Sequence, residues 1–245
     1  MRAEKLQIIK RAGRCLLNLI YPRRCPVCEA VLEPGKLICK VCREKLLFIE
    51  EPVCKKCGKP LDSETAEYCY DCGKKQHSYE AGKAVFLYHG GIRDSLYRFK
   101  YSNKREYACF YAAETVRQYG SWIKDRGVDA VVPIPLHKIR QHRRGYNQAE
   151  LYARMLGEML ELPVFPKALI RVENTRPQKE LNDAERKNNL KKAFKCRESI
   201  VQSKCILLVD DIYTTGSTID AAAKELKNAG VEKVFFICVS IGRGL

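Results

Sequence analysis

The sequence predicts an α/β fold, a parallel sheet with helices on both faces, together with a small cysteine-rich domain near the N-terminus. Apolar runs of strand length alternate with helical patterns from residue 81 onward, which is typical of a parallel sheet. One of these runs ends in acidic and hydroxylated residues, as strands beside a ligand often do. Four closely spaced cysteine pairs precede residue 78 and define the small domain, and 245 residues suffice for both parts.

The composition favours a partner that is rich in negative charge. The chain carries 45 Lys and Arg residues against 29 Asp and Glu residues, which gives a formal net charge of +16. That charge favours nucleic acid, nucleotides or pyrophosphate as partners, although the basic residues are spread along the chain and general basicity also explains them. No apolar run approaches the roughly 20 residues of a membrane span, and residues 16–20 do not make a convincing signal peptide. We therefore expect a cytoplasmic protein without a membrane span.

Residues 1–24 show the pattern of an amphipathic helix. Leu6, Ile9, Leu16 and Ile20 can share one face of such a helix, with basic residues elsewhere. A single apolar stripe favours docking on a neighbouring domain over binding to a membrane surface.

Eight of the thirteen cysteines form four C-x-x-C pairs, separated by 10, 11 and 11 residues, within a segment at 25–78. Two residues between thiolates let both sulfurs reach one ion at ~2.3 Å, and two such pairs complete a closed tetrahedral zinc site. Disulfides fit less well, because the pairs repeat evenly and no secretory signal is recognised. We predict a double zinc ribbon with two structural Zn²⁺ ions, paired sequentially, with an interleaved arrangement as the alternative. The predicted ligands are Cys25, Cys28, Cys39, Cys42, Cys54, Cys57, Cys69 and Cys72.

The first elements after the cysteine pairs are a strand at Ala84–Tyr88 and helices at Ile92–Tyr101 and Glu106–Lys124. Aromatic and basic residues are interleaved from position 93 to position 105. Such a mixture can stack bases and neutralise phosphates of single-stranded nucleic acid. We favour the simpler interpretation, a helix with an aromatic core face and a solvated basic face.

A second strand at Val128–Pro133 runs into a cationic loop at 138–148, which precedes a helix ending near Leu160. In an open parallel sheet this loop lies at the carboxyl edge, where ligands normally bind. Arginine side chains there can bind pyrophosphate through paired hydrogen bonds. The candidate residues for the pyrophosphate side are Pro135, Leu136, His137, Arg143 and Arg144.

A third strand is predicted at Ala168–Val172, followed by a long polar segment with a short helix at Asp183–Ala193. Long polar loops in α/β domains are often lids over a ligand. The candidate lid residues are Arg171, Thr175, Gln178 and Arg186, and the last predicted strand is Lys233–Ser240.

The most informative stretch is ILLVDDIYTTGSTI at 206–219. A buried strand, Ile206–Val209, is followed by two acids, a loop of hydroxylated residues with a glycine, and a helix at Ile219–Ala229. Free N–H groups at the helix start attract an anion, while the carboxylates accept hydrogen bonds from hydroxyls or hold a divalent cation. A sugar phosphate meets both requirements. The candidate residues are Asp210, Asp211, Thr214, Thr215, Gly216, Ser217 and Thr218.

This stretch resembles the ribose-phosphate signature of type I phosphoribosyltransferases. The resemblance implies a phosphoribosyltransferase-like sheet over 81–245 that binds phosphoribosyl pyrophosphate (PRPP) with Mg²⁺. Asp210 and Asp211 would hold the ribose hydroxyls, and Thr214–Thr218 would hold the 5′-phosphate.

The strings VVPIPLHKIRQHRRGYNQAELYA and RVENTRPQKELNDAERKNNLKKAF, together with the cysteine pairs, resemble the ComF family. Members of that family pair a zinc ribbon with a phosphoribosyltransferase domain, and several are needed for natural DNA uptake. The resemblance implies a protein that acts on or near single-stranded DNA, with a DNA-uptake helicase as a candidate partner. The alternative is an active phosphoribosyltransferase with an unknown acceptor in nucleotide or cofactor metabolism.

Overall fold

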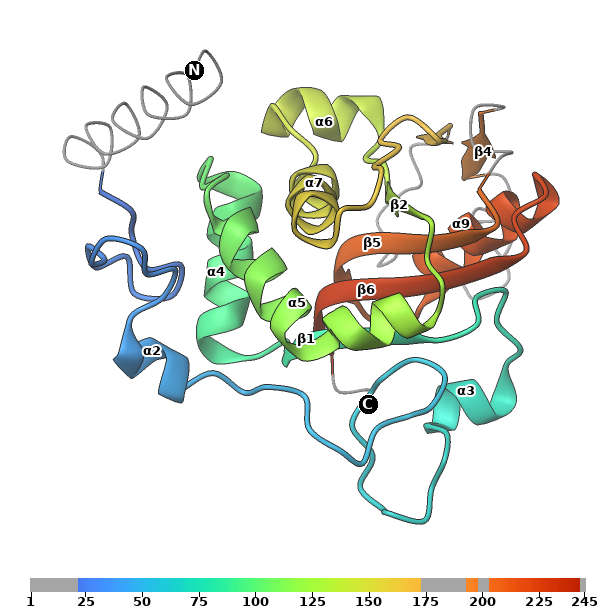
Figure 1. Ribbon diagram of the computed structural model, residues 1–245, viewed down its shortest axis with the longest axis horizontal. Coiled ribbons are helices and arrows are strands. Elements are labelled where there is room, and N and C mark those ends of the chain that lie inside the picture. The colour runs from blue at the N-terminus through green and yellow to red at the C-terminus, as the bar shows by residue number, and fades with distance from the viewer. Residues whose placement is uncertain (1–21, 173–192, 198–202, 243–245) are drawn as a thin grey trace, which may run out of the picture. The chain divides into compact units, whose positions relative to one another are not determined.

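The computed structural model describes residues 22–172, 193–197 and 203–242 (Figure 1). It divides the chain into two compact units, Met1–Leu46 and Leu47–Leu245. Most of the N-terminal helix predicted for 1–24 lies outside the described residues. The last three positions of that segment are not helical, and Arg24 forms an isolated β-bridge with Val31.

A four-stranded parallel sheet forms the centre of the second unit, as the sequence predicts. Its strand order is β1-β6-β5-β2. The two inner strands are apolar along most of their length because both of their faces are covered. The strands are β1 (Gly82–Leu87), β2 (Ala130–Pro133), β5 (Cys205–Tyr213) and β6 (Lys233–Ile241).

Helices cover both faces of this sheet, with α5 and α7 on one face and α9 on the other (Figure 1). Ala222, Ala223 and Leu226 of α9 pack on alternate residues of the strands, such as Leu208 and Phe236. This alternation follows from the period of two in a strand. The helices among the described residues of the unit are α3 (Tyr70–Lys74), α4 (Gly90–Tyr101), α5 (Tyr107–Asp125), α6 (Lys138–Arg144), α7 (Gln148–Leu160) and α9 (Ser217–Asn228).

The register of β2 and β5 places the two predicted ligand loops side by side. Pro133 pairs with Val209, so the segment after β2 and the end of β5 share the carboxyl edge of the sheet. The segment expected to be a cationic loop is helical, however, because 138–144 form α6. This helix ends at Gly145, whose φ of 77° is easily adopted by glycine.

Strand β5 is longer than predicted, because it continues through both acids to Tyr213 instead of ending at Val209. The reason lies in its neighbour: β6 extends to Ile241 and pairs with Asp210, Ile212 and Tyr213. The acid pair therefore sits on a paired strand, which holds its backbone in place.

The third predicted strand exists but does not belong to the parallel sheet. Strand β3 (Leu169–Arg171) pairs antiparallel with β4 (Phe194–Cys196), which the sequence did not reveal. Leu169 and Phe194 are buried in the same apolar cluster as α9, and this burial stabilises the hairpin-like pair. The helix predicted at Asp183–Ala193 lies outside the described residues, except for its last position.

Candidate ligand site and cysteine clusters

The two predicted ribose ligands differ in their electrostatic surroundings. Asp211 Oδ1 lies 3.0 Å from Nζ of Lys100, a residue of α4, and the Asp211 N–H donates to Asp210 Oδ1 at 2.8 Å. Burial, reinforced by the charge of Asp211, raises the pKa of Asp210 to about 7. Burial opposes the charge on Lys100, but Asp211 outweighs it and raises the pKa of the ammonium. One acid is thus paired with a cation, while the other can hold a proton near neutral pH.

The predicted phosphate loop connects β5 to α9. Thr214 and Thr215 are exposed, and the hydroxyls of Thr215 and Ser217 lie 3.0 Å apart. Gly216 has a φ of 75°, and a Cβ at this position would lie 2.3 Å from the Tyr213 hydroxyl oxygen. A glycine is therefore required here for both conformation and space. Thr218 follows in the first turn of α9, where N–H groups lack partners within the helix.

Arg171 is the one predicted lid residue that the structure describes. Burial and the neighbouring Arg140 lower the pKa of Arg171, while Asp210 acts in the opposite direction, so Arg171 lies within electrostatic reach of Asp210. The guanidinium carbon of Arg171 lies 5.4 Å from the ring centroid of Phe194 in β4. Thr175, Gln178 and Arg186 lie outside the described residues.

Three of the predicted pyrophosphate residues precede α6, and the other two, Arg143 and Arg144, form its last turn. Pro135, Leu136 and His137 are partly buried, and His137 Nδ1 accepts a hydrogen bond of 3.3 Å from the Ile139 N–H, which caps the helix. Arg143 is exposed.

Arg144 is tethered to neighbouring residues. It donates to Gln148 Oε1 and to the Tyr101 hydroxyl, each at 3.0 Å, and its guanidinium lies 4.8 Å from the Tyr101 ring centroid. Because Arg143 is exposed and Arg144 is already hydrogen-bonded, the guanidinium of Arg143 is the better placed of the two to bind an anion.

Two sets of residues that position the site were missed from the sequence. One is Lys100, which the amphipathic pattern assigned to a solvated basic face. The other is the string Tyr146-Asn147-Gln148, whose side chains donate to the carbonyls of Phe99, Ile134 and Lys100. These bonds join the end of α4 to the segment after β2. Polar residues next to a glycine turn were a signal for such anchoring, whereas the partner of Lys100 lies more than 100 residues away.

The aromatic residues of α4 do not all form a core face, contrary to expectation. Phe99 is fully buried, but Tyr97 and Tyr101 are 63% and 58% exposed. Their ring centroids lie 4.9 Å apart. The helix therefore presents two adjacent aromatic rings to solvent, beside Arg144.

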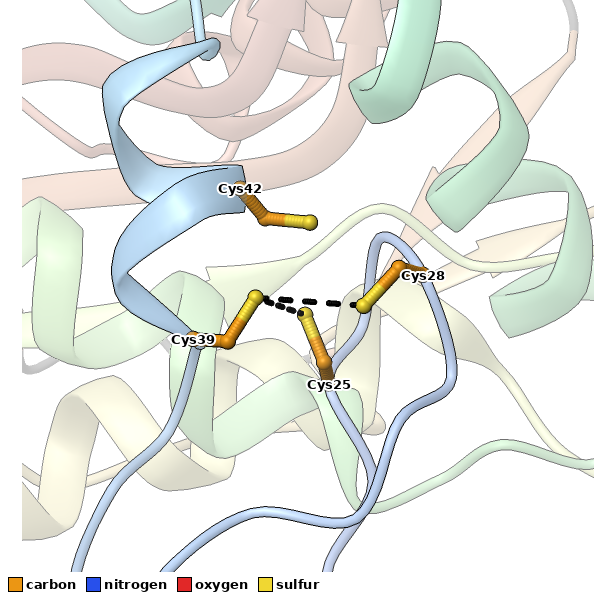
Figure 2. A group of neighbouring side chains, drawn as sticks. All are labelled: Cys25, Cys28, Cys39 and Cys42. Atoms are coloured by element: carbon orange, nitrogen blue, oxygen red, sulfur yellow. Dashed lines mark hydrogen bonds between the residues drawn. The ribbon is translucent and has the colours of Figure 1, made fainter.

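The first cysteine cluster lies in the first unit and is formed by Cys25, Cys28, Cys39 and Cys42, the last of which belongs to α2 (Lys40–Glu44). The four side chains converge on one point (Figure 2). Cys39 Sγ lies 3.7 Å from Cys25 Sγ and 3.8 Å from Cys28 Sγ. A tetrahedral zinc with Zn–S bonds of ~2.3 Å requires S–S edges of about 3.8 Å. The cluster fits a structural zinc ion.

The second cluster has the same form and lies in the second unit. Cys54, Cys57, Cys69 and Cys72 bring their sulfurs within 4.8 Å of one another, and Cys57 Sγ lies 3.6 Å from Cys69 Sγ. The cysteines are thus grouped sequentially, and the interleaved alternative is wrong. Four thiolates close the coordination shell of zinc, so each ion would have a structural role.

Among the residues that the structure describes, no helix is long and apolar enough to cross a membrane.

Two domain families match the chain in agreement with this architecture. The double zinc ribbon domain family matches residues 16–73, and the phosphoribosyl transferase domain family matches residues 116–244. The second match covers more than half of the chain and includes β2, β5, β6 and the acid pair.

Several curated proteins are similar over most of their length. Competence protein F of Haemophilus influenzae is 32% identical over 219 residues, which cover 86% of this chain and 93% of that protein. Competence protein ComFC of Bacillus subtilis is 28% identical, with 82% of each chain covered. DNA utilization protein YhgH of Escherichia coli is 29% identical, with 90% of this chain and 98% of that protein covered. The chain belongs to the ComF family, in which a double zinc ribbon is joined to a phosphoribosyltransferase domain.

Proposed function

We propose that this protein binds PRPP with Mg²⁺ at the carboxyl edge of its sheet and acts in DNA uptake in the cytoplasm. The observation that carries the PRPP proposal is the acid pair on β5, directly beside a hydroxyl-rich loop at the start of α9. The phosphoribosyl transferase family match supports it. Thiols grouped for metal binding are typical of a reducing compartment, which supports the cytoplasmic location.

Each group at the site has a distinct task in this proposal. Asp210 and Asp211 accept hydrogen bonds from the ribose hydroxyls, and Lys100 holds the Asp211 carboxylate in a fixed orientation. The loop Thr214–Thr218 binds the 5′-phosphate through hydroxyls and N–H groups. Arg143, in the last turn of α6, and the segment at 135–137, which precedes this helix, steady the pyrophosphate group. Mg²⁺ would neutralise phosphate charge and assist departure of pyrophosphate.

Binding is tested by calorimetric titration of the zinc-loaded protein with PRPP in the presence of Mg²⁺. We expect Asp211→Asn to lower the affinity more than tenfold, because it weakens an acceptor for the ribose and leaves Lys100 without its ion pair. Asp125→Asn, a change in an exposed acid at the end of α5, is the matched control. An unchanged affinity of Asp211→Asn, with zinc content equal to wild type, would place the ribose elsewhere.

A transferase activity is the enzymatic form of this proposal. An acceptor would attack C1′ of PRPP as pyrophosphate departs, and the protein would contribute mainly positioning and charge stabilisation. The measurement is release of pyrophosphate from PRPP with candidate acceptors. Release that requires both an acceptor and Asp211 supports an enzyme. Tight PRPP binding without release by any acceptor supports a regulatory ligand instead.

The role in DNA uptake is suggested by the names of the relatives, two of which are competence proteins and one a DNA utilization protein. The α4 surface adds a physical argument for single-stranded DNA. Two exposed tyrosine rings beside Arg144 offer stacking surfaces and positive charge together. A DNA-uptake helicase is a candidate partner that would bring such a strand.

The DNA proposal is tested by measuring oligonucleotide affinity across a range of salt concentrations. Phosphate contacts predict a steep fall of affinity with rising salt, and Tyr97→Ala and Tyr101→Ala should each weaken binding by about fivefold or more through lost stacking. Tyr70→Ala removes a ring of similar exposure on α3 and is the control. A flat salt dependence, or equal losses in all three variants, would exclude this surface.

A further inference from the structure

The segment that leaves the second cysteine cluster makes direct contact with the first turn of α9. The Ser78 N–H donates to Asp220 Oδ1 at 2.7 Å, and Lys75 Nζ lies 3.2 Å from Asp220 Oδ2. His77 Nδ1 lies 3.4 Å from the same carboxylate, and the His77 side chain is almost fully buried. Burial alone would raise the pKa of Asp220, but these contacts outweigh it and lower the pKa to about 2. A carboxylate of α9 is thus held by three residues of the segment at 75–78, which follows the second cysteine cluster.

A second contact lies next to the predicted phosphate loop at 214–218. The hydroxyls of Tyr79 and Tyr213 lie 2.8 Å apart in the interior, and both side chains are buried. Tyr213 immediately precedes the loop, and its hydroxyl occupies the space that a Cβ at Gly216 would need. Both rings pack on Phe236, Tyr213 in a parallel stack and Tyr79 edge-on. The shape of the loop therefore depends on where the two tyrosine rings lie.

The second cysteine cluster is hydrogen-bonded to the sheet. The Gly82 N–H, at the start of β1, donates to the Lys56 carbonyl between Cys54 and Cys57 at 2.9 Å. Both cysteines are fully buried in the apolar cluster that also contains Tyr79, Tyr213 and Phe236. A metal ion that fixes these thiolates therefore also fixes the residues on which Tyr79 packs.

We propose that Tyr79 and Asp220 are positioning residues, through which the zinc-fixed second cluster sets the shape of the phosphate loop at 214–218. This inference rests on the proposed function, because it assigns that loop to the 5′-phosphate of the ligand. It adds that the second zinc ribbon affects the affinity for the ligand through these two residues, although its cysteines do not contact the ligand.

The inference is tested with Tyr79→Phe, which removes one hydroxyl and leaves the ring in place. The Tyr213 hydroxyl then loses its buried partner, and we expect the affinities for ribose 5-phosphate and for PRPP to fall by a similar factor, about fivefold to fiftyfold. The affinity for pyrophosphate should stay within twofold of wild type, because its predicted ligands lie on α6 and the preceding segment. Asp220→Asn, which removes the ion pair with Lys75, should act in the same direction.

The matched control is Tyr152→Phe, which removes a buried hydroxyl that is bonded to Thr115 at 2.5 Å, on helices α7 and α5. The control should leave all three affinities unchanged. Both tyrosine variants should retain the zinc content of the wild type, measured by elemental analysis. Equal losses of ribose 5-phosphate and pyrophosphate affinity in Tyr79→Phe would indicate general damage and overturn the inference.

A second readout needs no ligand. Amide hydrogen exchange at residues 214–219 should be faster in Tyr79→Phe than in wild type or Tyr152→Phe, because the loop opens more often. If this change occurs and the wild type binds neither ribose 5-phosphate nor PRPP, the positioning contact stands while the proposed function fails. Unchanged exchange together with wild-type affinity in Tyr79→Phe would refute the positioning role and leave the proposed function intact.

Discussion

The two cysteine clusters share one spacing and one predicted metal, yet they differ in what surrounds them. In the first unit, Cys28 is exposed, although Cys25 and Cys42 are buried. The local backbone bonds of the first C-x-x-C pair recur in the second cluster, so they do not distinguish the two clusters. In the second unit, Cys54 and Cys57 are fully buried in the apolar cluster under α9. The spacing determines the metal chemistry, whereas the surroundings determine what the metal stabilises.

The first C-x-x-C pair of each cluster forms a tight turn, which we call its knuckle. The residue that follows the second cysteine of this pair shows the difference most directly. It is Glu29 in the first cluster and Gly58 in the second, and both have a positive φ, of 61° and 75°. A Cβ at Gly58 would lie 2.8 Å from the Gly82 carbonyl oxygen, so a side chain there meets the backbone of the sheet. The first knuckle accepts a long side chain at the corresponding position.

The largest expected effect comes from removing one thiolate of each cluster. Cys57→Ser should lose one zinc ion and lower the unfolding free energy of the second unit by more than about 5 kcal/mol, because metal binding is coupled to folding and the cluster lies within the core. Cys28→Ser should also lose one zinc ion but change the main unfolding transition by less than about 1 kcal/mol. Elemental analysis and calorimetry provide the measurements. Similar losses of stability in both variants would abolish the distinction between the clusters.

A smaller effect is expected from adding a single methyl group. Gly58→Ala should destabilise the second unit by about 2–4 kcal/mol, because it combines a left-handed backbone with a contact to an immobile carbonyl. Gly35→Ala has a similar φ of 83° but open space around the new Cβ, so it should cost only about 1 kcal/mol. Denaturant unfolding of both variants measures the difference. Equal costs would show that the knuckle at Gly58 is not pressed against β1.

The smallest expected effect comes from the ligand site of the second unit, where the partly buried Asp210 opposes the stability that the cluster provides. The pKa of Asp210 is raised to about 7, so the native state holds one proton more than the unfolded chain between about pH 4 and pH 7. Its contribution to stability is therefore present at low pH and is lost as the pH rises through about 7. Asp210→Asn cannot ionise, so we expect it to be more stable than wild type at pH 8 by about 1–2 kcal/mol.

The measurement is the stability difference between Asp210→Asn and wild type at pH 5 and at pH 8, without ligand. The difference should grow with pH, and taking a difference cancels the effect of pH on the zinc clusters, which both proteins share. Asp125→Asn should show no such trend. A stability difference that stays constant or shrinks with rising pH would show that ionised Asp210 does not destabilise the native state.

Local patterns were sufficient to predict much of this architecture. The run at 206–209 and the acids after it located β5, and the even cysteine spacing located both clusters, because these features depend on residues close in sequence. The prediction that the segments after β2 and β5 lie side by side rested on the rule that ligand loops share the carboxyl edge of a parallel sheet, and the pairing of the two strands confirms it.

The remaining features depend on contacts between distant residues. Ser78 meets Asp220 across 142 positions, and Lys100 meets Asp211 across more than 100. No periodicity encodes such a partner, and a partly buried lysine looks like any other basic residue of an amphipathic helix. Strand β4 was missed because an alternation over only three residues carries too little signal, while its pairing with β3 decides its structure.

The close approach of Gly58 to Gly82 limits the substitutions that members of this family can accept at these positions during evolution. A Cβ at Gly82 would lie 2.1 Å from the Phe236 ring, so a side chain at Gly82 must displace this buried ring, and one at Gly58 must displace the backbone of β1. Glu29 and Gly35 of the first ribbon face no such obstacle. We expect drift among homologues to accumulate in the first ribbon, while Gly58 of the second ribbon and Gly82 of β1 are retained.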